Sequence, residues 1–372
     1  MTARRYVTRL GVCMAGLVVL LVLSPGIGTE SASYGWWDVW RVRLGIAIPV
    51  EELQARPFAD VDGDGVVSPE DAAGFADAAR YVGAARLARS LRALQVGMTL
   101  ALCGATFQVL FRNPLATPYT LGVAGGGSLG ALIAIRVGFT FAWLGVSSLA
   151  VSAFVGGIGV VAAVLFIARG ARGLTSNELL LAGVTMGLFC SAMMMLITVV
   201  SDERATFRMV RWMMGSLDAV SPVQRVTMLP LLVPAWVVLI GSARGLNQYR
   251  VGDDVAATRG VNVARLQGGC VLVATVATAA VVATCGPIGF VGLVVPQIAR
   301  LIVGADCRIL LPTSALIGAA FLVVCDWGAQ LAMPVAGWML GRELGSATLP
   351  IGVVTAVVGV PTFLTLLRTR AG

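Results

Sequence analysis

The chain alternates long apolar segments with short polar loops over most of its length. About ten such segments can be drawn, and several reach the roughly 20 residues that a helix needs to cross a bilayer. Shorter ones fit helices that are broken by glycine or proline and packed inside a bundle. The pattern predicts an all-α integral membrane protein with about ten transmembrane helices. The segments are Tyr6–Ile27, Ala93–Phe111, Leu121–Ile135, Phe141–Ile167, Leu179–Val200, Thr227–Ile240, Gly268–Thr284, Ile288–Val303, Ile309–Leu331 and Gly352–Leu367.

A much longer polar stretch separates the first two segments. We expect residues 1–27 to form the first transmembrane helix, residues 28–85 a small helical insert, and residues 86–370 the core with the remaining spans. Arg4 and Arg5 precede the first segment as basic residues precede a signal peptide, but the apolar run is long for a cleaved signal. We therefore expect it to remain as a span.

The composition excludes two kinds of catalytic chemistry. Of the 372 residues, 58% are hydrophobic and 12% are charged, about half the charged share of a soluble protein. The chain contains no His, and its 27 basic residues are all Arg. A phosphate-binding loop of the G-x-x-x-x-G-K-S/T type needs its Lys, so ATP hydrolysis by that route is excluded, as is His-based catalysis. The seven Cys lie mostly in apolar runs, which favours buried packing over disulfides.

The net charge of +8 does not indicate nucleic-acid binding, because the arginines are scattered through short loops. If the N-terminus is inside and the spans alternate, most arginines of the short loops fall on the inner side, as the positive-inside rule requires. This predicts that both termini are cytoplasmic and that the insert, in the long loop between the first two spans, faces outward.

The insert contains the stretch FADVDGDGVVSPEDAAGF, which has the spacing of a helix–loop–helix calcium site. It resembles a single dockerin-like or EF-hand-like loop over residues 60–71, although Asp stands where a bidentate Glu usually closes the site. Because an outward loop meets millimolar calcium, we expect the ion to order the insert; the alternative is a disordered acidic loop. The candidate ligands are Asp60, Asp62, Asp64, the Val66 carbonyl, Ser68 and Asp71.

The core shows a weak internal repetition. Cys103-Gly104 precedes Pro114 by the same spacing with which Cys285-Gly286 precedes Pro296, five apolar segments later. An odd offset would place the two copies in opposite orientations across the membrane, as in transporters with inverted repeats.

Three stretches carry a family resemblance: GMTLALCGATFQVLFRNPLA at 97–116, GPIGFVGLVVPQIARLIVG at 286–304 and LPIGVVTAVVGVPTF at 349–363. Together they resemble the FecCD-type permeases of ATP-driven importers for vitamin B12, haem and iron–siderophores. The resemblance implies a type II importer permease with inverted repeats in a bacterial cytoplasmic (inner) membrane. It implies further a second copy of the chain, two cytoplasmic ATPase subunits and an extracytoplasmic substrate-binding protein. The acidic insert lies outside the resemblance.

The resemblance also assigns roles to residues. The loop at 244–266 would press on the ATPase, with Gly252, Asp253, Asp254 and Gly260 in its two short helices. Gly can end one helix and Asp can start the next. The outer arginines Arg86, Arg89 and Arg342 would receive carboxylates of the binding protein, which suits bidentate pairing. Span five would line the translocation path, with Thr185, Met186, Ser191 and Met194 as candidates.

Two other classes remain open. A secondary transporter without an ATPase would need ionisable residues inside the membrane, and Asp326 is the clear candidate. A calcium-binding membrane surface protein would make the insert the functional part. Co-purification of an ATPase subunit would separate the importer from both.

Overall fold

The computed structural model describes residues 3–28, 34–54, 67–139, 141–143, 146–168, 176–218, 228–341 and 348–371. It is helical almost throughout. The N-terminal segment contains α1 (Ala3–Leu23) and η1 (Ser24–Gly26), and the insert contains α2 (Trp36–Arg43) and α3 (Val50–Leu53). The rest are α4 (Pro69–Leu110), η2 (Pro118–Leu121), α5 (Val123–Val137), β1 (Ala142–Trp143), β2 (Val146–Ser147), α6 (Ser148–Ile167), α7 (Ser176–Val199), α8 (Glu203–Met213), α10 (Leu229–Gly241), α11 (Ala243–Val251), α12 (Asp253–Thr258), α13 (Val263–Cys285), α14 (Val291–Val303), α15 (Cys307–Leu340) and α16 (Ile351–Ala371).

Every apolar segment expected from the sequence corresponds to a helix. Among the described residues, 5 helices are long and apolar enough to cross a membrane, and the pair α10 and α11, bent by 47°, raises this to 6. Shorter apolar helices account for the remaining segments: α5, α14, α16 and the apolar part of α1. Each expected segment thus has a helix, and among the described residues 5 or up to 6 of these helices are long enough to cross a membrane.

Helix α4 runs from the insert into the core without a break, through the boundary expected at residues 85 and 86. Its first turn is a capping box: the Ser68 hydroxyl accepts a hydrogen bond from the Asp71 amide at 3.2 Å, and the Asp71 carboxylate accepts one from the Ser68 amide at 2.8 Å. Pro69 follows at the first helical position, where its missing N–H costs nothing. With 42 residues, α4 is about 60 Å long, twice the thickness of a bilayer core.

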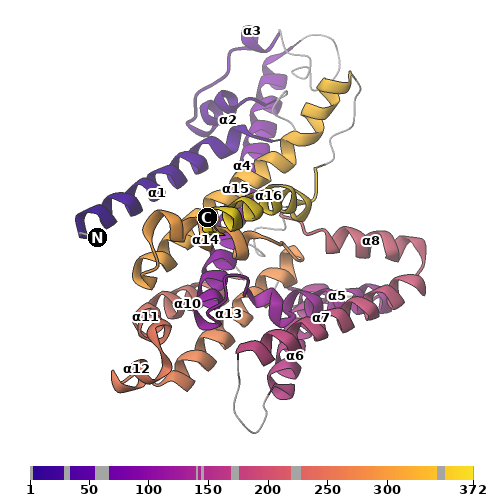
Figure 1. Cartoon of the computed structure of the whole chain (residues 1–372). Helices are drawn as coiled ribbons and strands as arrows, with labels where there is room; N and C mark the ends of the chain where they lie inside the picture. Colours follow the sequence, from indigo (N-terminus) through magenta and orange to yellow (C-terminus); the bar gives the residue numbers. More distant parts are fainter. Residues whose placement is uncertain are drawn as a thin grey trace.

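The two ends of α4 lie at opposite ends of the molecule. Helices α2 and α3 of the insert lie beside its N-terminal half, at the top of Figure 1. Its C-terminal end approaches α11 and α12, at the lower left of the same view. The insert and the segment expected to contact an ATPase are therefore separated by the length of α4.

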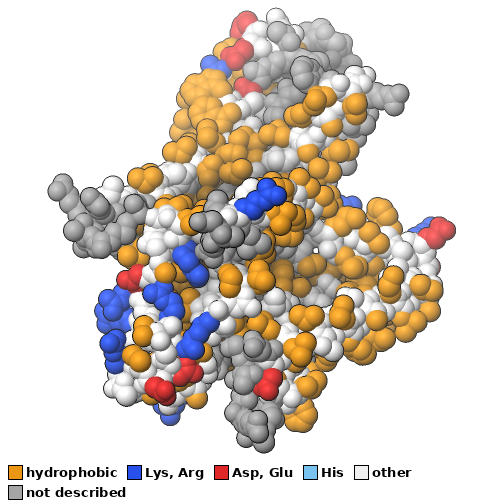
Figure 2. Space-filling model, in the orientation of Figure 1, with side chains coloured by type: hydrophobic (Ala, Val, Ile, Leu, Met, Phe, Trp, Pro, Cys, Tyr) orange, Lys and Arg blue, Asp and Glu red, His pale blue; other side chains and the backbone are white. Residues whose placement is uncertain are grey.

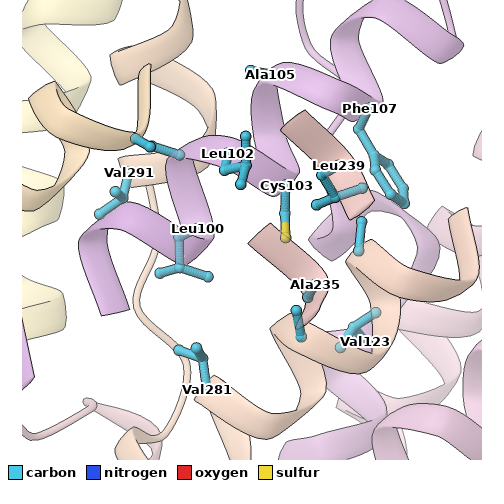
Figure 3. Close-up of a cluster of buried hydrophobic side chains, with 14 of the residues drawn as sticks. Leu100, Leu102, Cys103, Ala105, Phe107, Val123, Ala235, Leu239, Val281 and Val291 are labelled. Atoms are coloured by element: carbon cyan, nitrogen blue, oxygen red, sulfur yellow. The ribbon is translucent and has the colours of Figure 1, made fainter. Parts of the chain in front are cut away.

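Close helix crossings depend on glycine. At Gly104 an added Cβ would lie 2.6 Å from both the Cα and the carbonyl carbon of Gly292 in α14, and at Gly97 it would lie 2.8 Å from the carbonyl carbon of Gly318 in α15. Small residues allow such backbone approach between membrane helices. Around these crossings the core is built from fully buried side chains such as Leu102 and Phe107 (Figure 3).

The glycines at 125–130 have the same function in α5. An added Cβ at Gly130 would lie 3.0 Å from the Ser152 carbonyl carbon in α6, and one at Gly126 would lie 2.6 Å from a Val160 methyl. These glycines therefore allow α5 and α6 to pack closely. A short hairpin of β1 and β2 precedes α6, which begins at Ser148, seven residues later than the apolar run that starts at Phe141.

The insert has a small core of its own. Phe75 of α4 is fully buried and lies 4.9 Å from the ring of Tyr34, measured between ring centroids. Val42 of α2 and Leu53 of α3 join the same buried cluster. The insert therefore packs on the N-terminal part of α4, and this helix continues without a break into the core.

Candidate functional site

The segment expected to contact an ATPase consists of two short helices, α11 and α12, separated by Gly252 as the sequence predicts. After α12, Gly260 adopts a left-handed φ of 82°, and the Val261 amide donates to the Ala256 carbonyl while the Gly260 amide donates to Ala257. This is a Schellman cap, and it needs glycine at that position. Basic side chains gather on this end of the molecule, at the lower left of Figure 2. Asp254 lies exposed on α12.

Arg112 joins this segment to the end of α4. Its guanidinium donates to the Tyr249 carbonyl at 2.7 Å, forms an ion pair with Asp253, and stacks over the Tyr249 ring at 4.6 Å from the centroid. Arg112 itself has a left-handed φ of 49°. One side chain thus contacts both short helices.

A second connection joins α11 to the start of α15. The Asn247 side chain donates to the Asp306 carboxylate at 2.6 Å and accepts a hydrogen bond from the Cys307 amide at 2.8 Å. Desolvation raises the pKa of Asp306, but the hydrogen bond from Asn247 and the charges of Arg308 and Arg250 outweigh it and hold the pKa below its ordinary value. The carboxylate is therefore ionised at neutral pH.

At the opposite end, Arg86 is buried rather than displayed. It is 7% exposed, and its Nη1 donates to the carbonyls of Pro25 and Tyr34, both at 3.1 Å. It thereby fixes the chain that leaves the first span against α4. The third expected docking residue, Arg342, lies outside the described residues.

Arg89 occupies the centre of an ionic network. Its Nε donates to Asp326 of α15 at 2.8 Å, and its Nη1 donates to Asp218 at 2.7 Å. Asp326 is fully buried and also accepts a hydrogen bond from Gln330 at 2.8 Å, whereas the Asp218 side chain is 49% exposed. Arg92 adds a hydrogen bond to the Asp218 carbonyl at 3.0 Å. The network ties α4 and α15 to the segment after α8.

The path candidates on α7 point in different directions. Thr185 and Ser191 lie on the exposed face of the helix, each with its hydroxyl bonded to the carbonyl four residues earlier. Met186 is half-buried. Met194 is 8% exposed and packs with Leu132 in the interior of the chain, away from that face. Periodicity alone does not distinguish these two directions on an apolar helix.

The sequence-based reasoning missed α8. This helix places Arg204, Arg208 and Arg211 along one exposed stripe, while Ala205 and Met209 are buried. The signal was available, because basic residues at i, i+4 and i+7 beside small and apolar ones predict an amphipathic helix.

Only part of the calcium loop lies within the described residues. Ser68 and Asp71 form the capping box of α4, and the Asp71 carboxylate also accepts the Ser68 hydroxyl at 2.8 Å. Asp60, Asp62, Asp64 and Val66 fall outside the described residues. Within the part of the chain that the structure describes, no group of three or more His, Cys, Asp or Glu side chains could hold a metal ion.

Two known permeases are similar in sequence to most of this chain. The chain is 37% identical over 289 residues to the cobalamin import system permease of Halobacterium salinarum, covering 78% of this chain and 73% of the relative. It is 36% identical over 288 residues to the hemin transport system permease of Yersinia pestis, covering 77% and 82%. A solved metal-chelate type ABC transporter in an inward-facing conformation matches with a TM-score of 0.74 at 27% identity, covering 98% of this chain and 99% of the other. The model of the FecCD transport family matches residues 16–369, so the chain is a member of that family.

Proposed function

We propose that the chain is the membrane permease of an ATP-driven importer, and that it moves a metal chelate into the cytoplasm from a binding protein. The cargo classes are ferric siderophore, haem and cobalamin, of which the relatives name the last two. The observation that carries the proposal is the family match over residues 16–369, together with a two-helix segment, α11 and α12, at the far end of α4 from the insert.

The proposed assembly contains two copies of this chain, two ATPase subunits and one binding protein. ATP hydrolysis is assigned to the separate subunits, because the chain has no Lys with which to build a phosphate-binding loop. Asp254 and the N-terminal end of α12 would contact the ATPase on the cytoplasmic side, and Arg112 would pass the resulting movement to α4.

Docking of the binding protein is assigned first to Arg89. Its partner Asp218 is half exposed, so a carboxylate from an arriving protein could replace Asp218 on the same guanidinium. Arg86 would act from beneath by holding the neighbouring chain through the Pro25 and Tyr34 carbonyls. Arg342 remains a docking candidate by its resemblance alone.

We also propose that calcium binds at residues 60–71. The ligand spacing supports this proposal, as does the start of α4 at Pro69, within the last three residues of the expected loop. The test is thermal unfolding of the full chain in nanodiscs with and without millimolar calcium, beside the variant D62N/D64N. A calcium-dependent rise in the wild type that is absent from the variant supports the site; equal behaviour of the two proteins rejects it.

The topology test uses two exposed positions, Tyr81 in the N-terminal third of α4 (78% exposed) and Thr258 at the end of α12. Each is replaced by Cys in a Cys13→Ser background, because the other six cysteines are buried. A membrane-impermeant maleimide should label Tyr81→Cys in intact cells and Thr258→Cys only after permeabilisation. Labelling of both from one side would end the proposal.

The energy source is tested separately. Co-expression with a family ATPase should give a stable complex whose ATP hydrolysis rises when loaded binding protein is added, and whose uptake stops when ATP is withheld. A purified chain that moves chelate into vesicles without any ATPase would favour the secondary transporter.

A further inference from the structure

A large cavity lies beside the basic stripe of α8. Its volume is about 770 Å³, within the range of small-molecule sites, and it is an open hollow bordered by the end of α5, the β hairpin, the start of α6 and α8. Phe139 and Phe141 form an apolar wall, with their ring centroids 5.2 Å apart in an edge-on arrangement. Arg208 and Arg211 line the same cavity, together with hydroxyl groups such as that of Ser148.

The described residues place little negative charge opposite the arginines on this wall. No Asp or Glu is among the described residues that line the cavity. Arg208 makes no ion pair or hydrogen bond with any described residue. The side chain of Arg211 is 70% exposed and lies 3.7 Å from an Asp218 oxygen, but the other oxygen of that carboxylate is already bound to Arg89 at 2.7 Å.

A second, smaller cavity of about 360 Å³ continues from the first. The two share Ser147, Leu149 and Trp212 as lining residues, and the second is bounded mainly by apolar side chains of α6 and α13, with Arg92 at its wall. The combined space therefore offers an apolar interior to the body of a ligand and guanidinium groups to its charged end.

We propose that this cavity binds an amphiphilic anion, with its apolar body against Phe139 and Phe141 and its carboxylate or phosphate on Arg208 and Arg211. Guanidinium groups pair bidentately with both kinds of anion. Two sources supply this chemistry: a metal chelate that carries carboxylates, or the headgroup of an anionic phospholipid. The chelate source rests on the proposed function and restricts the cargo to anionic chelates.

The test compares haem with its dimethyl ester, in which the two propionate carboxylates are replaced by uncharged methyl esters. Each is titrated against the chain in phosphatidylcholine nanodiscs, with quenching of tryptophan fluorescence as the readout and empty discs subtracted. Haem should bind about tenfold more tightly than the ester. The variant R208Q/R211Q should bring the ratio close to one, and R208K/R211K should keep most of it.

Arg204 provides the matched control, since it lies on the same stripe but does not line the cavity. R204Q should retain the wild-type ratio. Equal binding of acid and ester by the wild type, or an effect of R204Q as large as that of R208Q/R211Q, overturns the site.

A second titration, with an anionic lipid in the disc, distinguishes a metal chelate from a phospholipid headgroup as the occupant of the cavity. If phosphatidylglycerol in the disc weakens haem binding to the wild type but not to R208Q/R211Q, the headgroup occupies the cavity; if haem binding is unchanged, the chelate does. ATP-dependent uptake by the complex with an ATPase is measured in parallel. If the wild type shows no charge preference but normal uptake, the cavity alone is rejected. If the wild type shows the preference but no ATP-dependent uptake, the proposed function alone is rejected.

Discussion

Replacing Gly104 by alanine tests the helix crossing on which the core depends. The new Cβ would lie 2.6 Å from two backbone carbons of Gly292, whereas carbon atoms in contact need about 3.5–4.0 Å. Because the obstacle is backbone, no side chain can rotate away, and α4 and α14 must separate by about 1 Å. Overpacking of this kind costs about 1–3 kcal/mol.

The matched control is Gly268→Ala in α13. Gly268 is exposed, and an added Cβ would meet nothing within 4 Å. Alanine is favoured over glycine in an exposed helix by about 1 kcal/mol, so this substitution should stabilise the chain. The same glycine-to-alanine change is therefore expected to lower the stability of the chain at position 104 and to raise it at position 268.

The assay is thermal unfolding in nanodiscs, followed with a dye that fluoresces on reacting with thiols. Cys103, next to Gly104, is fully buried and becomes reactive only when the core opens. At equal heating rates the midpoint should fall for Gly104→Ala and hold or rise for Gly268→Ala. A midpoint for Gly104→Ala at or above that of the wild type would refute the close crossing of α4 and α14.

Three further predictions concern the two ends of the molecule. Arg112→Gln removes the ion pair to Asp253 and should lower ATP-driven uptake several-fold while ATP hydrolysis continues. The control is Arg259→Gln, which should change neither uptake nor hydrolysis, because the Arg259 side chain is exposed and has no partner among the described residues. Equal uptake by both variants would contradict the role of Arg112. Asp326→Asn breaks a buried ion pair and should destabilise the chain by an amount at the lower end of about 3–5 kcal/mol, because Arg89 keeps its ion pair with Asp218. Asp218→Asn should cost under about 1 kcal/mol, because Asp218 is half exposed. A lower unfolding midpoint for Asp218→Asn than for Asp326→Asn would be inconsistent with the network. The lowered pKa of Asp306 means that its bonds stabilise the native chain above the ordinary Asp pKa of about 4, and that this contribution is lost as the pH falls through the lower native value. The gap in unfolding midpoint between the wild type and Asp306→Ala should therefore be present at pH 7 and shrink below pH 4, and a gap that stays constant would show that the charge is not involved.

The sequence alone determined the features that depend on local composition. Apolar length predicts a span because the cost of crossing a bilayer is a property of each segment, and every expected segment is a helix. The break at Gly252 was likewise predictable, because backbone freedom belongs to the glycine itself.

Only the tertiary structure decided the features that depend on distant partners. The sequence around Arg89 predicts a surface arginine, whereas in the fold it is paired with Asp326, which lies 237 positions away along the chain. Met194 and Ser191 stand three residues apart on one apolar helix, and only the position of α5 and α8 decides that the first is buried and the second exposed. Burial and ion pairing are set by which helices meet, and the pattern along a single apolar helix does not contain that information.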